Sequence, residues 1–270
     1  MIRLTFDLEI YPPMRDDDAF TNLQGQIVQS IADRLRNEDV CVTCFCTGEF
    51  SLRFPDLVRK LHANGNEIAN HSMYHIPFRD SDEKNFVRSI LDCDEAIKAV
   101  VGIKPIGFRA PGGNVPPGIA ASLQSIGFLY DSSMCRTYIP GWYEGGLCPA
   151  TPYHPSVADI RREDPANSSF VEVPLGRFPH LPVPLGGMFL TSFPILSSRI
   201  IEAMCEDSRI HVMYLHPVDF LSPQESRRYP WDHMRMRDRA RSVLSVVLSS
   251  SRSADMRLST LARGFVDSNL

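Results

Sequence analysis

Hydrophobic positions along the chain fall into two alternating kinds of segment, short β-rich runs and longer amphipathic stretches. We predict seven strands from the short runs: Ile2–Phe6, Val40–Cys46, Glu67–Asn70, Ile106–Arg109, Phe128–Asp131, Phe170–Pro174 and Ile210–Leu215. Strands that alternate with helical stretches are typical of a parallel sheet with crossover helices. The pattern therefore predicts an α/β protein.

The amphipathic stretches predict helices between these strands. Leucine or isoleucine recurs every four residues from Leu23 to Leu35, which gives a helix one apolar face. A second helix around Pro55–Ala63 should stop at Asn64-Gly65, a sequence suited to a left-handed cap. Apolar residues from Phe86 to Val101 mark a third helix that ends at Gly102.

The chain shows no repeat, low-complexity linker or change of composition that would divide it, so we expect one domain over residues 1–270. The segment Thr137–Asn167 is rich in proline and glycine and is predicted to be a long surface loop. Loops of this length often form the rim of an active site.

Composition narrows the class of protein. The 270 residues are 43% apolar and 22% charged, as in soluble globular proteins, and the net charge of −4 does not suggest a nucleic-acid or lipid partner. No apolar run approaches the ~20 residues needed for a membrane span, and the first residues lack the apolar core of a signal peptide. We therefore expect a cytoplasmic protein without a membrane span. The seven cysteines suit reduced thiols, and Cys41, Cys44 and Cys46 alternate within a predicted buried strand, which favours core thiols over a metal site.

Polar side chains suited to metal and proton chemistry follow the predicted strands. His71 and His75 come directly after the strand Glu67–Asn70, and a spacing of four residues, one helical turn, would let both imidazoles reach one cation. Other strand ends carry carboxylates, a guanidinium and a third imidazole: Asp7, Glu9, Arg109, Asp131 and His216. Barrels of parallel strands assemble their active sites at this end, so we expect these side chains to share one site.

Together these segments resemble the polysaccharide deacetylases of carbohydrate esterase family four, also called the nodulation-deacetylase homology domain. The resemblance is carried by Leu4-Thr5-Phe6-Asp7-Leu8-Glu9, His71-x3-His75, Phe108-Arg109-Ala110-Pro111-Gly112-Gly113 and Leu215-His216-Pro217. It implies a distorted, incomplete (β/α) barrel, in agreement with the seven predicted strands. It also implies a metal-dependent hydrolase that removes the N-acetyl group from an acetylated sugar or glycan intermediate, releasing acetate and a free amine.

The resemblance also implies roles for individual residues. Asp7 is the general base, Arg109 orients it, and His216 is the general acid. His71 and His75 are ligands of one divalent metal ion, which we expect to be Zn²⁺ because imidazole and carboxylate ligands suit it. The commonest family pattern has a second aspartate where this chain has Leu8. Glu9, one position further along, resembles the variant of the family that reads Asp-x-Glu or Asp-x-Asp, and this resemblance makes Glu9 the third ligand. Its longer side chain, at the next inward-pointing position of an extended segment, could reach the same ion.

Two assignments near the substrate are less direct. The carboxylate that tunes His216 or Arg109 is Asp131 or Glu172, and we favour Asp131. Gly112 and Gly113 would let the main chain approach the substrate, so that a backbone N–H near Gly112 stabilises the oxyanion.

The residues leave other interpretations open. Asp7 could be an exposed turn acid, Glu9 the partner of a loop arginine, Arg109 a buried ion-pair anchor and His216 a core histidine. At the level of function, the alternatives are an allantoinase-like hydrolase of cyclic amides or imides and an inactive carbohydrate-binding module. The chain carries no Gly-x-Ser-x-Gly elbow, phosphate-binding loop or dinucleotide motif, which argues against serine hydrolases, nucleotide hydrolases and dehydrogenases.

The long loop Thr137–Asn167 and the apolar run Leu181–Leu190 bear on the size of the substrate. The two segments could cover one end of the site and restrict it to short acetylated sugars, or they could only close the gap in an incomplete barrel. The sequence leaves both possibilities open.

Overall fold

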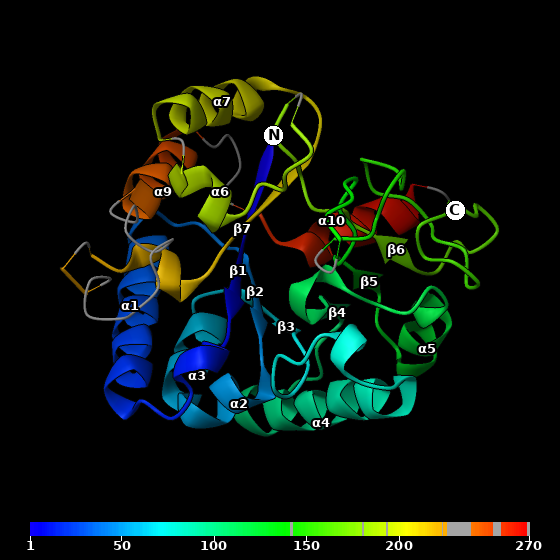
Figure 1. Cartoon of the computed structure of the whole chain (residues 1–270), viewed down its shortest axis with the longest axis horizontal. Helices are drawn as coiled ribbons and strands as arrows, with labels where there is room; N and C mark the ends of the chain where they lie inside the picture. Colours follow the sequence, from blue (N-terminus) through cyan, green and yellow to red (C-terminus); the bar gives the residue numbers. More distant parts are fainter. Residues whose placement is uncertain are drawn as a thin grey trace.

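The computed structural model describes residues 1–140, 143–179, 181–192, 194–222, 224–225, 239–250 and 255–268. Within them, seven parallel strands form one curled sheet in the order β6-β5-β4-β3-β2-β1-β7 (Figure 1). The strands are β1 Ile2–Leu8, β2 Thr43–Cys46, β3 Glu67–Asn70, β4 Gly107–Phe108, β5 Tyr130–Asp131, β6 Val171–Glu172 and β7 His211–Leu215. Six of the predicted runs contain one of these strands, and β1 runs two residues beyond the predicted run Ile2–Phe6. The prediction of an incomplete (β/α) barrel is confirmed.

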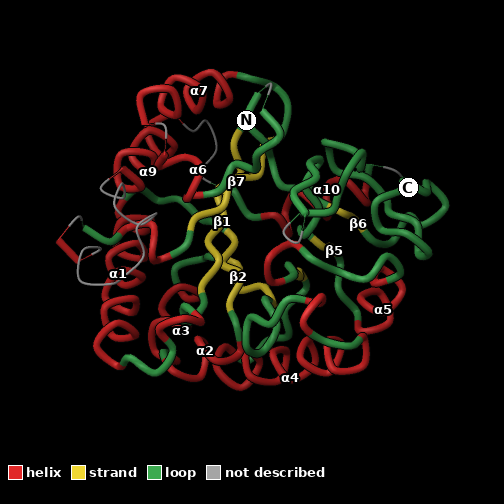
Figure 2. The backbone as a smooth tube through the Cα atoms, in the orientation of Figure 1, coloured by secondary structure: helices red, strands yellow, loops and turns green. Residues whose placement is uncertain are grey.

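Helices surround the strands on the outside of the curled sheet (Figure 2). The helices of the described residues are α1 Asp18–Asn37, α2 Gly48–Arg53, α3 Pro55–Ala63, α4 Glu83–Val101, α5 Ile119–Ile126, α6 Gly187–Ser192, α7 Pro194–Glu206, α9 Arg239–Ser250 and α10 Leu258–Asp267. The three predicted helices are confirmed as α1, α3 and α4. Gly65 (φ 87°) follows α3 and Gly102 (φ 82°) caps α4, and both adopt the left-handed conformation expected at such ends.

The two faces of the strands differ, and this difference positions the site. Leu4 and Phe6 of β1 and Met213 of β7 pack into the main apolar cluster with the helices. The alternate residues point inward because successive side chains of a strand lie on opposite faces. Asp7 of β1 and Tyr214 of β7 are such inward residues, and they reach the inside of the curled sheet, where the site lies.

Residues between β6 and β7 lie in the gap between these two strands, which are the edges of the curled sheet. Leu175 forms parallel bridges with both Cys135 and Val212, and Gly186 forms another with Tyr214. The Gly176 N–H donates to the Val212 carbonyl at 2.8 Å. The run Leu181–Leu190 therefore helps to close the gap in the barrel, as one of the two interpretations of the sequence proposed.

The cysteines belong to the core, as predicted. All seven are free thiols, and Cys44 and Cys46 are almost completely buried. Burial raises the pKa of both thiols, which keeps them protonated and unreactive. Within the described residues, no helix is both long and apolar enough to cross a membrane.

Candidate active site

A pocket of about 300 Å³ lies at the carboxyl ends of the strands and brings most of the predicted site residues together. Its lining includes Asp7, Glu9, His71, His75, Arg109, Gly112, Gly113 and His216. These residues come from the end of β1 and from the segments that follow β1, β3, β4 and β7, four places that are far apart in the sequence. The remaining predicted residue, Asp131, does not belong to this lining.

Three of the lining residues form a cluster suited to a metal ion. One ligand atom each from Glu9, His71 and His75 lies within 4.8 Å of the others. Glu9 Oε2 is 2.5 Å from His75 Nε2 and 3.9 Å from His71 Nε2. No arginine takes part in this cluster, so the alternative of a loop arginine as the partner of Glu9 receives no support from the described contacts.

The backbone after β3 explains how both imidazoles reach Glu9. The expectation of a helical turn is wrong, because residues 71–75 form an irregular loop. Ser72 (φ 59°) and His75 (φ 53°) adopt the left-handed conformation, which is costly for side chains larger than glycine. The Ser72 N–H donates to Asn70 Oδ1 at 2.8 Å, and this bond helps to hold the turn. The two imidazole centroids lie 5.0 Å apart.

The protonation states in the cluster also suit a cation. His71 Nδ1 lies 2.7 Å from the Arg109 carbonyl, so this nitrogen carries the proton and donates it, leaving the lone pair on Nε2. Burial lowers the pKa of His71 to about 4. Burial alone would raise the pKa of Glu9, but the positive charge of His75 outweighs it and lowers that pKa to about 2. The cluster therefore offers a neutral imidazole and a carboxylate, the forms that bind metals.

Unsatisfied atoms support the same interpretation. Glu9 Oε2 and His71 Nε2 are buried, yet neither has a hydrogen-bond partner of acceptable geometry in the described chain. Buried polar atoms without partners are rare because desolvation is costly. A divalent ion bound by two nitrogens and an oxygen would satisfy both atoms, so the residues fit the predicted cofactor.

Asp7 lies next to this cluster and is held by Arg109. The exposed fraction of Asp7 is 4%, so it is not an exposed turn acid. Arg109 Nη1 donates to Asp7 Oδ1 at 2.6 Å and to Thr5 Oγ1 at 2.9 Å. Two further bonds from Arg109 reach Ser132, and the guanidinium lies 4.0 Å from the centre of the Phe45 ring. Arg109 is thus a buried ion-pair anchor, and the residue it anchors is the predicted base.

His216 faces the second oxygen of Asp7 and has a carboxylate partner of its own. His216 Nε2 is 3.9 Å from Asp7 Oδ2, and His216 Nδ1 is 3.6 Å from Asp219 Oδ2. Burial lowers the pKa of His216, but the negative charges of Asp219, Glu9 and Asp7 outweigh burial and raise it to about 9. The imidazole is therefore cationic at neutral pH, as a general acid requires.

Sequence reasoning missed Asp219. Its carboxylate accepts the His216 N–H at 2.8 Å, closing a capping box around the short helix η4 Pro217–Phe220. A Cβ at Gly187 would overlap this carboxylate, so glycine at that position makes room for it. An acid three residues after a strand-end histidine was the available signal.

The structure places Asp131 among serines and beside Glu172, while Arg109 acts electrostatically on Glu172. Its carboxylate accepts two bonds from Ser133, from Oγ at 2.6 Å and from N at 3.2 Å, and it lies against Glu172. Burial raises the pKa of both carboxyls. The described contacts join neither Asp131 nor Glu172 to His216. Asp131 is linked indirectly to the segment before the Gly112 turn, because Ser133 Oγ accepts the Ala110 N–H at 2.8 Å.

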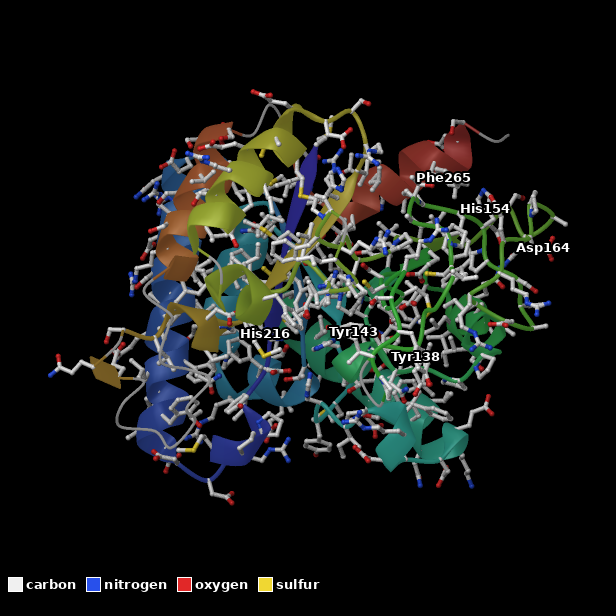
Figure 3. The ribbon with its side chains drawn as sticks, turned by 45° about the horizontal axis from the view of Figure 1, so that its top comes forward. Tyr138, Tyr143, His154, Asp164, His216 and Phe265 are labelled. Carbon is white, nitrogen blue, oxygen red and sulfur yellow. The ribbon has the colours of Figure 1, made fainter. Side chains whose placement is uncertain are left out.

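The turn η3 Pro111–Gly113 and two tyrosines complete the pocket. Gly112 and Gly113 both have φ 63°, so the main chain turns sharply beside the site. Tyr143 comes from the long loop Thr137–Asn167, and its hydroxyl lies 2.5 Å from that of Tyr214 in β7. Figure 3 labels Tyr143 next to His216 near the centre of the molecule. The long loop therefore contributes to the rim of the site, as its length suggested.

The fold and this pocket define a parallel-stranded α/β barrel whose carboxyl end carries a carboxylate–imidazole cluster beside a buried ion pair. Residues 1–130 match the family model described as "Polysaccharide deacetylase". A peptidoglycan-N-acetylglucosamine deacetylase from Bacillus cereus is 30% identical over 114 residues, 42% of this chain and 50% of that protein. The chain spans about a third to a half of the length of the curated relatives it matches.

Solved structures show the same fold. A Mycobacterium smegmatis protein assigned to the polysaccharide deacetylases aligns over 100% of this chain and 91% of its own, with a TM-score of 0.69 and 21% identity. Puue allantoinase aligns over 97% of this chain and 89% of its own, with a TM-score of 0.62 and 16% identity. The resemblance drawn from the motifs is thus confirmed: residues 1–130 are similar in sequence to the polysaccharide deacetylases, and the chain has the fold of these solved structures.

Proposed function

We propose that this protein hydrolyses the N-acetyl group of an acetylated sugar or glycan intermediate, releasing acetate and a free amine, and that it depends on a divalent metal ion. The observation that carries the proposal is the position of Asp7. One carboxylate oxygen is fixed by Arg109, the other faces His216 at 3.9 Å, and the whole group adjoins the ligand cluster. A base and an acid that face one pocket suit the hydrolysis of an amide.

The metal ion, with Zn²⁺ as our expectation, would be held by Glu9, His71 and His75. It would supply Lewis acidity toward the acetyl carbonyl and lower the pKa of water. The other parts of the reaction fall to the chain itself. Asp7, oriented by its hydrogen bond from Arg109, accepts a proton from the attacking water.

His216 then serves as the acid. Its cationic form donates a proton to the departing nitrogen, which would otherwise leave as a poor amide anion. Asp219 holds the imidazole in place and favours this cationic form. The Gly112 N–H, at a turn where no side chain blocks the approach, would donate to the oxygen on which negative charge develops.

The pocket favours a small substrate. Its volume of about 300 Å³ is at the lower end of small-molecule sites. Tyr143 from the long loop and Met188 from α6 line its sides. We therefore expect an acetylated monosaccharide or a short oligomer, bound through the acetamide-bearing unit, to be preferred over an insoluble polymer.

A metal-reconstitution assay tests the proposal. The protein is treated with a chelator, divided, and reloaded with Zn²⁺ or left without metal. Each sample is then given N-acetylglucosamine, short chitooligosaccharides or insoluble chitin. Acetate and primary amine are both measured, and Asp7→Asn serves as the matched variant without a base. We expect equal amounts of acetate and amine from the reloaded protein with the soluble substrates, and both products to form about 10²–10⁴-fold more slowly with Asp7→Asn.

The same assay separates the alternatives. Consumption of a ureide or cyclic imide without acetate release would establish an allantoinase-like hydrolase, a possibility raised by the fold it shares with Puue allantoinase. Binding of chitooligosaccharides without turnover by the metal-loaded protein would identify a carbohydrate-binding module. Either result would overturn the proposed deacetylation.

A further inference from the structure

The Tyr143–Tyr214 pair has one hydroxyl proton more than its described contacts use. Two phenols bring two O–H donors, and the contact between their oxygens at 2.5 Å uses one of them. The described residues supply no second acceptor to either hydroxyl. Burial raises the pKa of both phenols, so both protons are retained. One O–H donor is thus available to an occupant of the pocket.

The surroundings of the pair are shaped to hold both rings. A Cβ at Gly113 would come within 2.9 Å of the Tyr143 ring, and a Cβ at Gly186 would overlap the Tyr214 phenol. Tyr143 is 8% exposed and Tyr214 is 7% exposed. Glycine at both positions therefore leaves space for the rings, which fixes the two hydroxyls in place.

The position of the pair suggests which atom receives the proton. Tyr143 packs on Gly113, next to the Gly112 turn, and Tyr214 lies edge-on to His216 with the ring centroids 5.5 Å apart. The two rings therefore lie between the proposed oxyanion donor and the proposed acid. An acetamide bound between these groups would place its carbonyl oxygen within the same region.

We propose that Tyr143 and Tyr214 act as one hydrogen-bond donor to the acetamide carbonyl oxygen, strongest when negative charge develops on it. This inference rests on the proposed deacetylation and adds to it a side-chain donor from the long loop. One phenol donates to the other, and the second donates to the substrate. Such a relay polarises the terminal O–H, because hydrogen bonds in a chain strengthen one another.

A double-mutant cycle tests the relay. We measure kcat and KM for acetate release by Tyr143→Phe, Tyr214→Phe and the double variant, each loaded with Zn²⁺. Tyr153→Phe is the matched control, because Tyr153 is also buried and its hydroxyl donates to the Ile160 carbonyl at 2.6 Å outside the pocket. Thermal unfolding of all four variants reports on stability.

Removal of an oxyanion donor lowers kcat by about 10²–10³-fold. We expect a loss of this size in the double variant, with KM changed by less than a factor of about three. The more damaging single variant should lose nearly as much as the double variant, because the two phenols deliver a single donor. Tyr153→Phe should keep its kcat even where its unfolding temperature falls.

Three outcomes would overturn the inference: an unchanged kcat in the double variant, a rise in KM alone, or a loss of kcat in Tyr153→Phe that matches its loss of stability. Failure of the proposed function is recognised separately through acetate, whose carboxylate resembles the charged oxygen. If the wild-type protein turns over no acetylated sugar but binds acetate about tenfold more tightly than the double variant, the donor stands and the reaction does not. Equal acetate affinities in that case would contradict both.

Discussion

The two ends of the barrel use a glutamate in opposite ways. At the amino-terminal end of the strands, Glu67 accepts from Tyr130 Oη at 2.9 Å, from Thr43 Oγ1 at 2.7 Å and from the Ser259 N–H at 3.0 Å. At the carboxyl end, Glu9 Oε2 is buried beside two imidazoles and has no hydrogen-bond partner of acceptable geometry. The first carboxylate is satisfied by the protein alone, whereas the second is arranged for something that the protein must bind.

The difference shows how a structural polar cluster and a functional one can be distinguished. The Glu67 cluster ties α10 to β2, β3 and β5, since Thr43 Oγ1 also accepts the Leu258 N–H at 2.9 Å. Each group there meets a partner of complementary donor or acceptor character. In the Glu9 cluster the possible ligand atoms lie within 4.8 Å of one another, and Glu9 Oε2 and His71 Nε2 have no hydrogen-bond partner of acceptable geometry, an arrangement that a bound cation would satisfy.

The largest expected effect is on the Glu9 cluster. His75→Ala removes one ligand, so we expect most of the bound metal to be lost and turnover to fall by about 10³-fold, because the ion contributes several kcal/mol to the transition state. Elemental analysis of the purified protein measures the metal. Zn²⁺ at a hundred times its Kd should raise the unfolding free energy of the wild type by about 2.7 kcal/mol and that of the variant much less. Full metal content in His75→Ala would show that the cluster is not the site.

A smaller loss is expected when the base is changed and the ligands are left intact. Asp7→Asn preserves the shape of the side chain but cannot accept the proton, so turnover should fall by about 10²–10⁴-fold while metal remains bound. Kinetics and elemental analysis on the same preparation measure both quantities. Loss of metal in this variant would move Asp7 into the ligand set, and near-normal turnover would place the base elsewhere.

Substitutions of His216 or Asp219 should change the way turnover depends on pH. Because the pKa of His216 is raised from 6.5 to about 9, its acid form is present below that value and activity should decline as the pH rises through it. A bound cation lowers this value by repelling the imidazolium charge. We expect Asp219→Asn to move the decline to lower pH by about one unit, and His216→Ala to abolish the alkaline limb.

A second histidine–aspartate pair serves as the control for this profile. His211 Nε2 lies 3.1 Å from Asp207 Oδ2 at the start of β7, the opposite end of the same strand. Asp207→Asn should leave the pH profile of turnover unchanged. An equal shift in Asp207→Asn and Asp219→Asn would mean that a general change in charge, and not the carboxylate partner of His216, determines the pH at which turnover declines.

The smallest effect on activity is expected at the amino-terminal end. Glu67→Gln replaces an acceptor of three hydrogen bonds with an amide that cannot accept all of them, at a cost of about 1–3 kcal/mol in the free energy of unfolding. The unfolding temperature should fall by about 2–4 °C for each kcal/mol. Metal content and kcat should remain those of the wild type. A change in either would show that the two ends of the barrel are coupled.

The repeated local patterns of the sequence determined the elements and the approximate location of the site. Apolar residues that recur about every four positions define α1, and short β-rich runs define all seven strands. The carboxyl ends of parallel strands meet at one edge, so residues that directly follow them converge whatever the details of packing. Asp7, His71, Arg109 and His216 were found for this reason, together with the family motifs.

Only the tertiary structure decided how these residues are paired. The sequence favoured Asp131 as the tuning carboxylate, yet it lies against Ser133 and Glu172, while Asp219 faces His216. The helical turn expected between His71 and His75 is replaced by a loop with two left-handed residues. The Tyr143–Tyr214 contact joins residues 71 positions apart. Local periodicity determines which face a residue occupies, but such contacts depend on loop conformation and on the space that distant glycines leave, which no local pattern records.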